Sequence, residues 1–378
     1  MRCLQACELD GDAPQLKNGP MTRSHAGWLL SLVAVSACGG APRDASDAPT
    51  TGGDPVEASP AGPQAAEDKK DDPGGLEAER TRAVEIPPPI GLPPPWLSMP
   101  QPAYQSGAVF KFTPAACEER FYVNASGLAG GDAAFIRQLF DKFARLEGDR
   151  REYDTVMRVS KEFGVDPFAT LREIAACEGK GPDIVVVGIA TDKPTEMTVV
   201  FQKVIASLGK APGRVERDGD TSLFANPNGD EAVAQFGPNV LVFGPKDAVL
   251  AAGRARSGGG GFADAAKHLV RVKAKEMDLT VTEKGPNIEA SALIKVREGG
   301  AKRANDLATE IKADIQKASE RLANTPLKVL GERLRATKVA PRGNGVMVSG
   351  TLSRADLTSI LKSAASADLE QVMRSLKK

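Results

Sequence analysis

Histidine is almost absent from this sequence, and that absence limits the chemistry open to the protein. The 378 residues include two histidines, His25 and His268. Histidine is the side chain that titrates near neutral pH, and it is a frequent zinc ligand. A folded region that holds His268 alone has no second histidine for acid–base catalysis. We therefore interpret His268 as a structural residue, and we expect no cofactor.

Cysteines and clustered carboxylates are likewise too few for a metal site. Cys117 and Cys177 lie far apart in the region that has the pattern of a globular fold, which excludes the usual zinc motifs. Oxygen ligands crowd in one stretch only, at Asp218, Asp220, Asn226, Asn228 and Asp230. Their spacing matches no known calcium loop, and hairpin turns require the same residue types. The sequence thus predicts no metal site.

Aromatic residues make up only 5% of the chain. Both tryptophans, Trp28 and Trp96, precede the predicted folded region, so a carbohydrate site built on stacked rings is disfavoured. A glycosidase that uses a carboxylate pair stays open, because acids are plentiful and their geometry is not visible in a sequence.

Serine-based catalysis has weak support. The pattern S-x-x-K, which resembles the nucleophile motif of penicillin-binding proteins, occurs at 207–210, 359–362 and 375–378. No K-T-G or S-D-N element accompanies any of the three. We therefore discard all three matches.

The chain has no apolar run long enough to span a membrane. Its strongest run near the N-terminus, "AGWLLSLVAV" at residues 26–35, is about ten residues long, whereas a spanning helix needs about twenty. Such a run suits the apolar region of an export signal.

Small residues and a cysteine follow this run, in the order Val35, Ser36, Ala37 and Cys38. The segment 21–38 resembles the lipobox signal of bacterial lipoproteins. That resemblance implies a signal peptide at 21–37, cleavage before Cys38, lipidation of Cys38 and a membrane partner through the lipid. By the same resemblance, Gly39 implies the outer membrane, facing the periplasm or the surface, rather than the inner membrane.

Residues 1–20 do not fit an export signal. They contain Glu8, Asp10 and Asp12 where such signals carry positive charge, whereas Met21 opens a normal signal. We predict that 1–20 is a start-site artefact.

Proline concentrates between the lipobox and the rest of the chain. Residues 39–107 hold 14 of the 27 prolines, with 11 acids against 5 bases and no apolar periodicity. Such a composition buries too little apolar surface to fold. We expect 38–107 to be a disordered acidic tether that reaches roughly 45 Å. Alternatively, Pro93 to Trp96 docks in an aromatic groove of a partner, or Trp96 packs on its own domain.

The remaining chain predicts an α+β fold of antiparallel β-meanders with amphipathic helices. "DIVVVGIA" at 183–190 has the β-branched content of a buried strand, and short Gly-containing turns separate the strands from 214 to 244. An apolar stripe predicts a long helix from about residue 301. A recurring order of strand, helix, hairpin and helix suggests two similar halves, 108–262 and 263–378, packed as one unit.

An even number of mature-domain cysteines, in an oxidising compartment, predicts a disulfide. Cys117 and Cys177 are the pair.

Charge favours an anionic partner and not nucleic acid. Residues 108–378 hold 41 bases against 35 acids, and no nucleic-acid-binding motif accompanies them. Much of the excess lies after residue 265, at Lys312, Lys317, Arg321, Arg333, Arg335, Lys338 and Arg342.

These features lead to one functional hypothesis and two rivals. We expect a lipid-anchored cell-envelope protein whose domain binds an envelope protein or an anionic envelope component without catalysis. The alternatives are a hydrolase of cell-wall or lipid material, and a lipid or lipoprotein carrier that would need an apolar cavity.

Overall fold

The computed structural model describes residues 84–368, except for 115–116, 130–133, 135–136, 139–140, 143–149, 179–182, 226, 228–229, 256–261 and 263. The predicted signal peptide, Cys38 and the tether as far as residue 83 lie outside these residues. Asn226 and Asn228 lie outside them as well.

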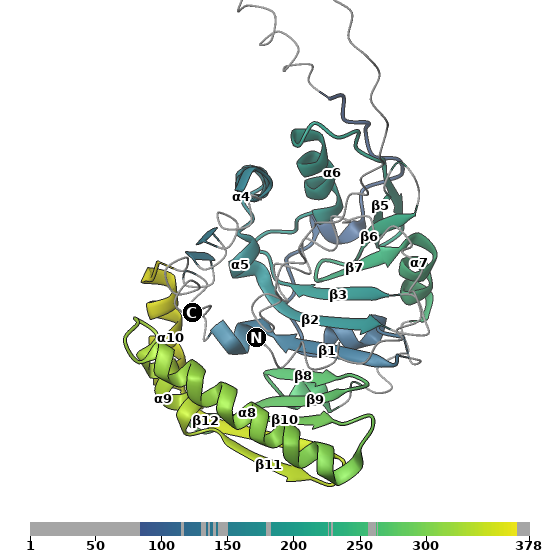
Figure 1. Cartoon of the computed structure of the whole chain (residues 1–378). Helices are drawn as coiled ribbons and strands as arrows, with labels where there is room; N and C mark the ends of the chain where they lie inside the picture. The colour runs from purple at the N-terminus through teal and green to yellow at the C-terminus, as the bar shows by residue number, and fades with distance from the viewer. Residues whose placement is uncertain are drawn as a thin grey trace, which may run out of the picture.

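The core of the fold is one twelve-stranded antiparallel sheet (Figure 1). Its strands, in chain order, are β1 (Glu119–Asn124), β2 (Leu171–Glu178), β3 (Ile184–Ile189), β4 (Val215–Asp218), β5 (Thr221–Ala225), β6 (Glu231–Phe236), β7 (Val240–Pro245), β8 (Val270–Lys273), β9 (Met277–Lys284), β10 (Asn287–Lys295), β11 (Lys338–Arg342) and β12 (Gly345–Ser353). Their order across the sheet is β11-β12-β10-β9-β8-β1-β2-β3-β7-β6-β5-β4. The α+β class with antiparallel meanders is confirmed.

The helices lie between and after these strands. They are the short turns η2 (Pro95–Ser98), η3 (Ala108–Phe112) and η4 (Ala265–Lys267), and the helices α2 (Ala125–Ala129), α4 (Arg150–Glu162), α5 (Pro167–Thr170), α6 (Met197–Ser207), α7 (Lys246–Ala255), α8 (Gly300–Leu322), α9 (Lys328–Arg335) and α10 (Arg354–Ser366). Local sequence explains several boundaries. Asp166 caps α5 ahead of Pro167, and Ser353 forms a capping box with Asp356 at the start of α10.

The two parts of the chain share one element order. Strands β1–β3 and β8–β10 each form a three-stranded meander, and helices follow each meander. The last strand of each part, β7 or β12, then pairs with the third strand of its own meander and leads into α7 or α10. The parts join where β8 pairs with β1, so the sheet is continuous. An origin by duplication stays a prediction.

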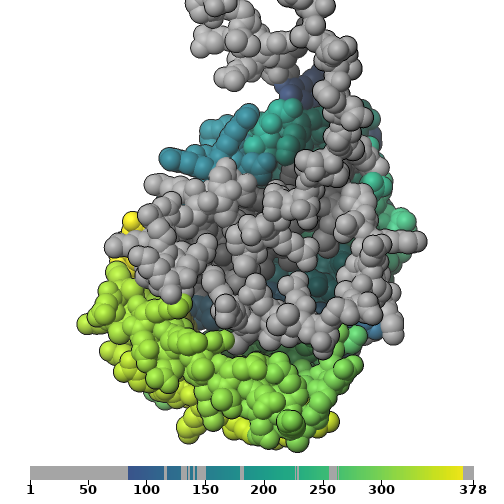
Figure 2. Space-filling model, in the orientation of Figure 1, coloured from purple at the N-terminus to yellow at the C-terminus, as the bar shows by residue number. Residues whose placement is uncertain are grey.

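The sheet is covered unequally. In the part with β1–β7, α4 and α6 pack on one face, and η3 and α7 pack on the other. In the part with β8–β12, α8 packs on the same face as α6, against Ile294, Val339 and Val346 (Figure 1). Figure 2 shows α8 forming the lower part of this face of the molecule. The opposite face of β8–β12 carries no described helix.

The folded region begins earlier than the predicted Ala108. Residues 84–107, which we call the strap, lie on the first part of the sheet. The backbone of Ile90 makes two hydrogen bonds to β4: Ile90 N donates to Val215 O at 2.8 Å, and Ile90 O accepts from Arg217 N at 2.9 Å. Trp96 is buried, and its Nε1 donates to Asp220 O at 2.9 Å. The tryptophan thus packs on its own domain and is not available to a partner's groove.

The predicted disulfide is confirmed. Cys117 and Cys177 are bonded, with Cα atoms 5.5 Å apart, beside the start of β1 and the end of β2. It ties the entry of the sheet to a strand 60 residues further along. Among the described residues, no helix is both long enough and apolar enough to cross a bilayer.

Candidate functional site

The uncovered face of β8–β12 is the candidate binding surface, and we call it the open face. Residues that pair directly across an antiparallel sheet share a face, so the strand register assigns its members. They are Arg271, Lys273, Asp278, Thr280, Thr282, Lys284, Asn287, Glu289, Ser291, Leu293, Lys295, Lys338, Ala340, Arg342, Met347, Ser349 and Thr351. All of them are half-buried or exposed.

A row of hydroxyl groups crosses the middle of the open face. Ser349 pairs with Ser291, and Ser291 pairs with Thr280. Lys338 continues the row at the β11 side, and Arg271 continues it at the β8 side. Hydroxyl groups both donate and accept hydrogen bonds, and Lys338 at one end attracts acceptors of negative charge, whereas Arg271 at the other end is bonded to Asp278. The row therefore suits a ligand with several anionic oxygen atoms.

The charge of the open face is strongly positive. It holds six Lys or Arg side chains and two acids. Asp278 pairs with Arg271, and Glu289 pairs with Lys284 at 2.6 Å. The other four cations have no ion pair within the described part of the chain; they are Lys273, Lys295, Lys338 and Arg342. The basic excess noted in the sequence is thus divided, because Lys312, Lys317 and Arg321 lie on α8.

His268 lies at the edge of the open face, where its side chain contacts Thr282. It follows η4 and has an extended backbone. Its position beside the open face has no signal in the sequence. Its Nδ1 and Thr282 Oγ1 are 2.7 Å apart. Burial and the nearby charge of Arg271 lower the pKa of His268. A neutral imidazole bonded to a threonine fits the predicted structural role.

The most buried acid of the described chain supports the strap. Glu173 on β2 is 1% exposed. Its carboxylate accepts hydrogen bonds from Tyr104 Oη at 2.7 Å, Tyr122 Oη at 2.9 Å, Ser106 Oγ at 2.8 Å and Gly107 N at 2.8 Å. Burial, and then Glu173 itself, raise the pKa of both tyrosines, so both remain donors. The site is filled by the chain's own groups, which indicates a structural role.

A second buried acid holds a serine in a closed network. Glu196 accepts two hydrogen bonds from Arg217, at 2.9 and 2.6 Å, and a third from Ser222 Oγ at 2.5 Å. Hydrogen bonding to Glu196 raises the pKa of Arg217. Ser222 is 0% exposed, so no substrate can reach its hydroxyl without unfolding the sheet locally. This network stabilises the β4 end and offers no accessible nucleophile.

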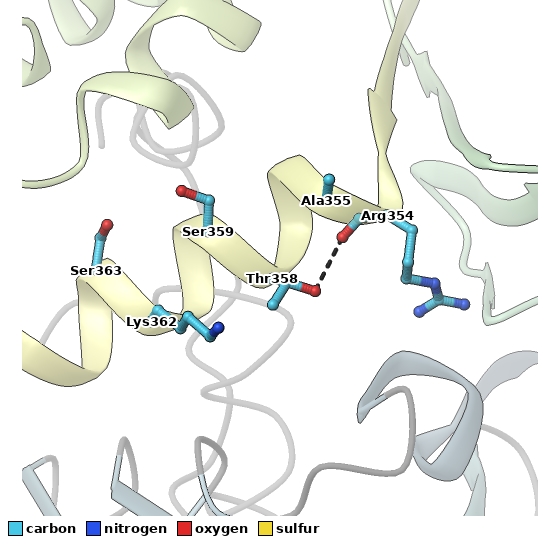
Figure 3. A pocket seen from close by; sticks show the side chains of 6 residues that line it. All are labelled: Arg354, Ala355, Thr358, Ser359, Lys362 and Ser363. Carbon is cyan, nitrogen blue, oxygen red and sulfur yellow. Dashed lines mark hydrogen bonds between the residues drawn. The ribbon is translucent and has the colours of Figure 1, made fainter.

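One surface depression lies along α10 (Figure 3). Its lining consists of Arg354, Ala355, Thr358, Ser359, Lys362 and Ser363, all from this one helix. Ser359 and Lys362 belong to one of the discarded S-x-x-K matches, and Figure 3 shows them projecting in different directions. No acid from a second element converges on the depression among its lining residues. The depression gives no support to serine chemistry.

The metal candidates do not assemble within the described residues, which hold no cluster of three or more His, Cys, Asp or Glu side chains suited to an ion. Asp220 belongs to the turn between β4 and β5, where its carbonyl accepts from Trp96.

Comparisons with known proteins give no family. No protein-family model matches the sequence, and no curated protein matches it. Three crystal forms of TP0453 share 9%, 9% and 10% identity with the chain; they cover 68%, 68% and 69% of it and 97% of their own chain, at TM-scores of 0.32, 0.34 and 0.29. At such scores the likeness carries no argument about fold or function.

Proposed function

We propose that this chain is a lipid-anchored cell-envelope protein whose domain binds an anionic envelope component, without catalysis, on the open face of β8–β12. The observation that supports this most is the set of four unpaired cations around the hydroxyl row. Flat, charged surfaces of this kind bind multivalent partners through many weak contacts. Lipopolysaccharide, with its several phosphates, has the required chemistry.

The anchor rests on the sequence. Acylation of Cys38 would hold the chain at the membrane, because several acyl chains bind far more firmly than one. The segment from 39 to 83 would link the anchor to the strap. We place the protein on the outer membrane because Gly39 follows the modified cysteine.

The two rivals have less support. A hydrolase needs an accessible nucleophile or carboxylate pair, whereas Ser222 is buried and Glu173 and Glu196 are bonded by the chain's own donors. A carrier needs an apolar cavity, and the described clusters are packed cores between helices and sheet.

The ligand is tested with charge reversals on the two faces. Lys295→Glu/Lys338→Glu changes the open face, and Lys312→Glu/Lys317→Glu makes the same change on exposed α8 positions. Because one Lys near an anionic surface contributes about 1 kcal/mol, the first pair should lose at least about tenfold in affinity for immobilised lipopolysaccharide. The second pair should lose little. Equal losses would contradict the proposed surface.

The anchor is tested separately in cells. Full-length protein should partition with membranes and yield an acylated peptide that begins at Cys38, whereas Cys38→Ala should be released to the soluble envelope fraction. Detection of any peptide from 1–20 would refute the start-site prediction.

A further inference from the structure

Large apolar side chains that stand exposed on the described chain all belong to the strap. They are Ile86, Ile90, Leu92 and Met99, with 40%, 51%, 86% and 55% of their surface accessible. We call these four residues the ridge. The four lie within 14 residues of one segment, and exposed apolar side chains that are concentrated in this way mark a contact with a partner or a membrane.

The backbone of the strap holds the ridge outward. Both backbone groups of Ile90 bond to β4, so its side chain cannot turn inward without breaking them. Gly91 has φ +93°, and a Cβ there would lie 2.5 Å from Arg217 O, so only glycine allows the chain to approach β4 so closely. Leu92 follows this turn and points to solvent. Trp96 is buried and anchors the strap beyond it. The ridge is therefore ordered before it meets a partner.

The ridge is also free of charge along the chain. None of the 25 residues from Ile86 to Phe110 is charged. The open face, in contrast, holds six cations. The aliphatic side chains and prolines of this segment suit the boundary between lipid headgroups and acyl chains, whereas exposed Glu216, which pairs with Ile90, would lie at the headgroups.

The ridge lies where the lipid anchor would bring it to a bilayer. Residues 39–83 separate Cys38 from the first residue of the strap, so the strap is the described segment nearest to the anchor along the chain. The strap runs along β4, which is one edge of the sheet, whereas β11 is the other edge. The end of the sheet that carries the ridge is thus the end tied to the anchor.

We propose that the ridge inserts shallowly into the bilayer that holds the anchor, so that the domain rests on the membrane by its β4 edge. This inference rests on the proposed anchor for its location, but not for the lipid contact itself. It has one consequence for the open face. The open face belongs to the strands at the β11 end of the sheet, away from the β4 edge that rests on the membrane. It would therefore bind an anionic component that lies away from the lipids around the anchor.

The test uses protein without acyl chains, the mature chain with Cys38→Ala, and vesicles of pure phosphatidylcholine. This protein should float with the vesicles in a density gradient, and raised salt should not release it. Ile90→Ser/Leu92→Ser should lower the vesicle partition constant at least about tenfold, because burial of one aliphatic side chain changes this constant by about that factor or more. Leu92→Ile in a protein that keeps Ile90 should bind the vesicles as the parent does. The open-face pair Lys295→Glu/Lys338→Glu is the matched control and should bind as the parent does.

Each outcome decides the proposal. Failure of the parent to float, or equal flotation of the serine variant, would overturn it, and cross-linking from position 92 in cells would then identify a protein partner. The vesicle test uses protein without an acyl chain, so its failure would not count against the proposed anchor. Likewise, absence of the acylated Cys38 peptide would refute the anchor but not the lipid contact of the ridge. Unfolding curves of the serine variant should match the parent, since Leu92 is mostly exposed.

Discussion

Gly188 gives the sharpest test of how the strap is held on the sheet. A Cβ built at Gly188 on β3 would lie 2.0 Å from Tyr104 Oη and 2.6 Å from Tyr104 Cζ. Gly188→Ala therefore forces the ring to move, and the ring cannot move without losing its 2.7 Å hydrogen bond to Glu173.

The size of the effect follows from two contributions. A hydrogen bond to a charged group contributes about 1.5–3 kcal/mol, and overpacking in a tight site costs about 1–3 kcal/mol. We expect Gly188→Ala to lower the free energy of unfolding by about 3–5 kcal/mol. The protein should remain folded, because Ile90 and Trp96 hold the rest of the strap.

A double-mutant cycle measures the contact itself. Urea unfolding is followed by circular dichroism for Gly188→Ala, Tyr104→Ala and the double variant. With the ring removed, Gly188→Ala should cost under about 1 kcal/mol, giving a coupling of at least about 2 kcal/mol. Gly350→Ala on β12 is the matched control, since its Cβ would meet only Thr337 Oγ1, at 3.4 Å. Equal costs of Gly188→Ala in both backgrounds would refute the reasoning.

Three further predictions concern single contacts. Replacing both Cys117 and Cys177 by Ala should lower stability by up to about 4 kcal/mol in urea unfolding, because the bond closes a loop of about 60 residues; no change would show that the bond contributes nothing. A hydrogen bond from Arg271 lowers the pKa of Asp278 below its ordinary 3.8, so its contribution is present above that pH and is lost as pH falls through the folded pKa. Asp278→Asn should thus destabilise more at pH 7 than at pH 2; an equal difference at both would contradict the pairing. Ser353→Ala should lower the free energy of unfolding by about 1 kcal/mol and reduce the helical circular dichroism signal; unchanged values would show that the cap of α10 contributes nothing.

The strap shows where sequence reasoning stopped. Its composition, rich in proline and without periodicity, predicted a free tether, and that pattern is typical of one. What holds it are contacts between distant residues, such as Trp96 with Asp220, 124 positions apart, and Gln101 with Asn239, 138 positions apart. Neither has a local pattern. The one signal in the sequence was an acid, Glu173, beside the apolar residues of β2, since an acid that becomes buried requires donors from elsewhere.

The open face was also missed, although part of its signal is in the sequence. Polar residues alternate with apolar ones along β9, β10 and β12, which is typical of strands with one solvated face. Alternation assigns Lys295 and Ser291 to one face of a strand. It does not show that both join Lys338, or that no described helix covers them.

The sequence by itself determined the fold class, the buried strand at 183–190, the long helix and the disulfide partners, because apolar periodicity, turn glycines and cysteine number depend on neighbours in the chain. The anchor at Cys38 also rests on sequence alone. Only the tertiary structure decided which cations share a surface, that Trp96 turns inward, and that the aliphatic residues around it face outward. Those facts depend on which strands pair and which helix covers which face, and residues more than a hundred positions apart set them.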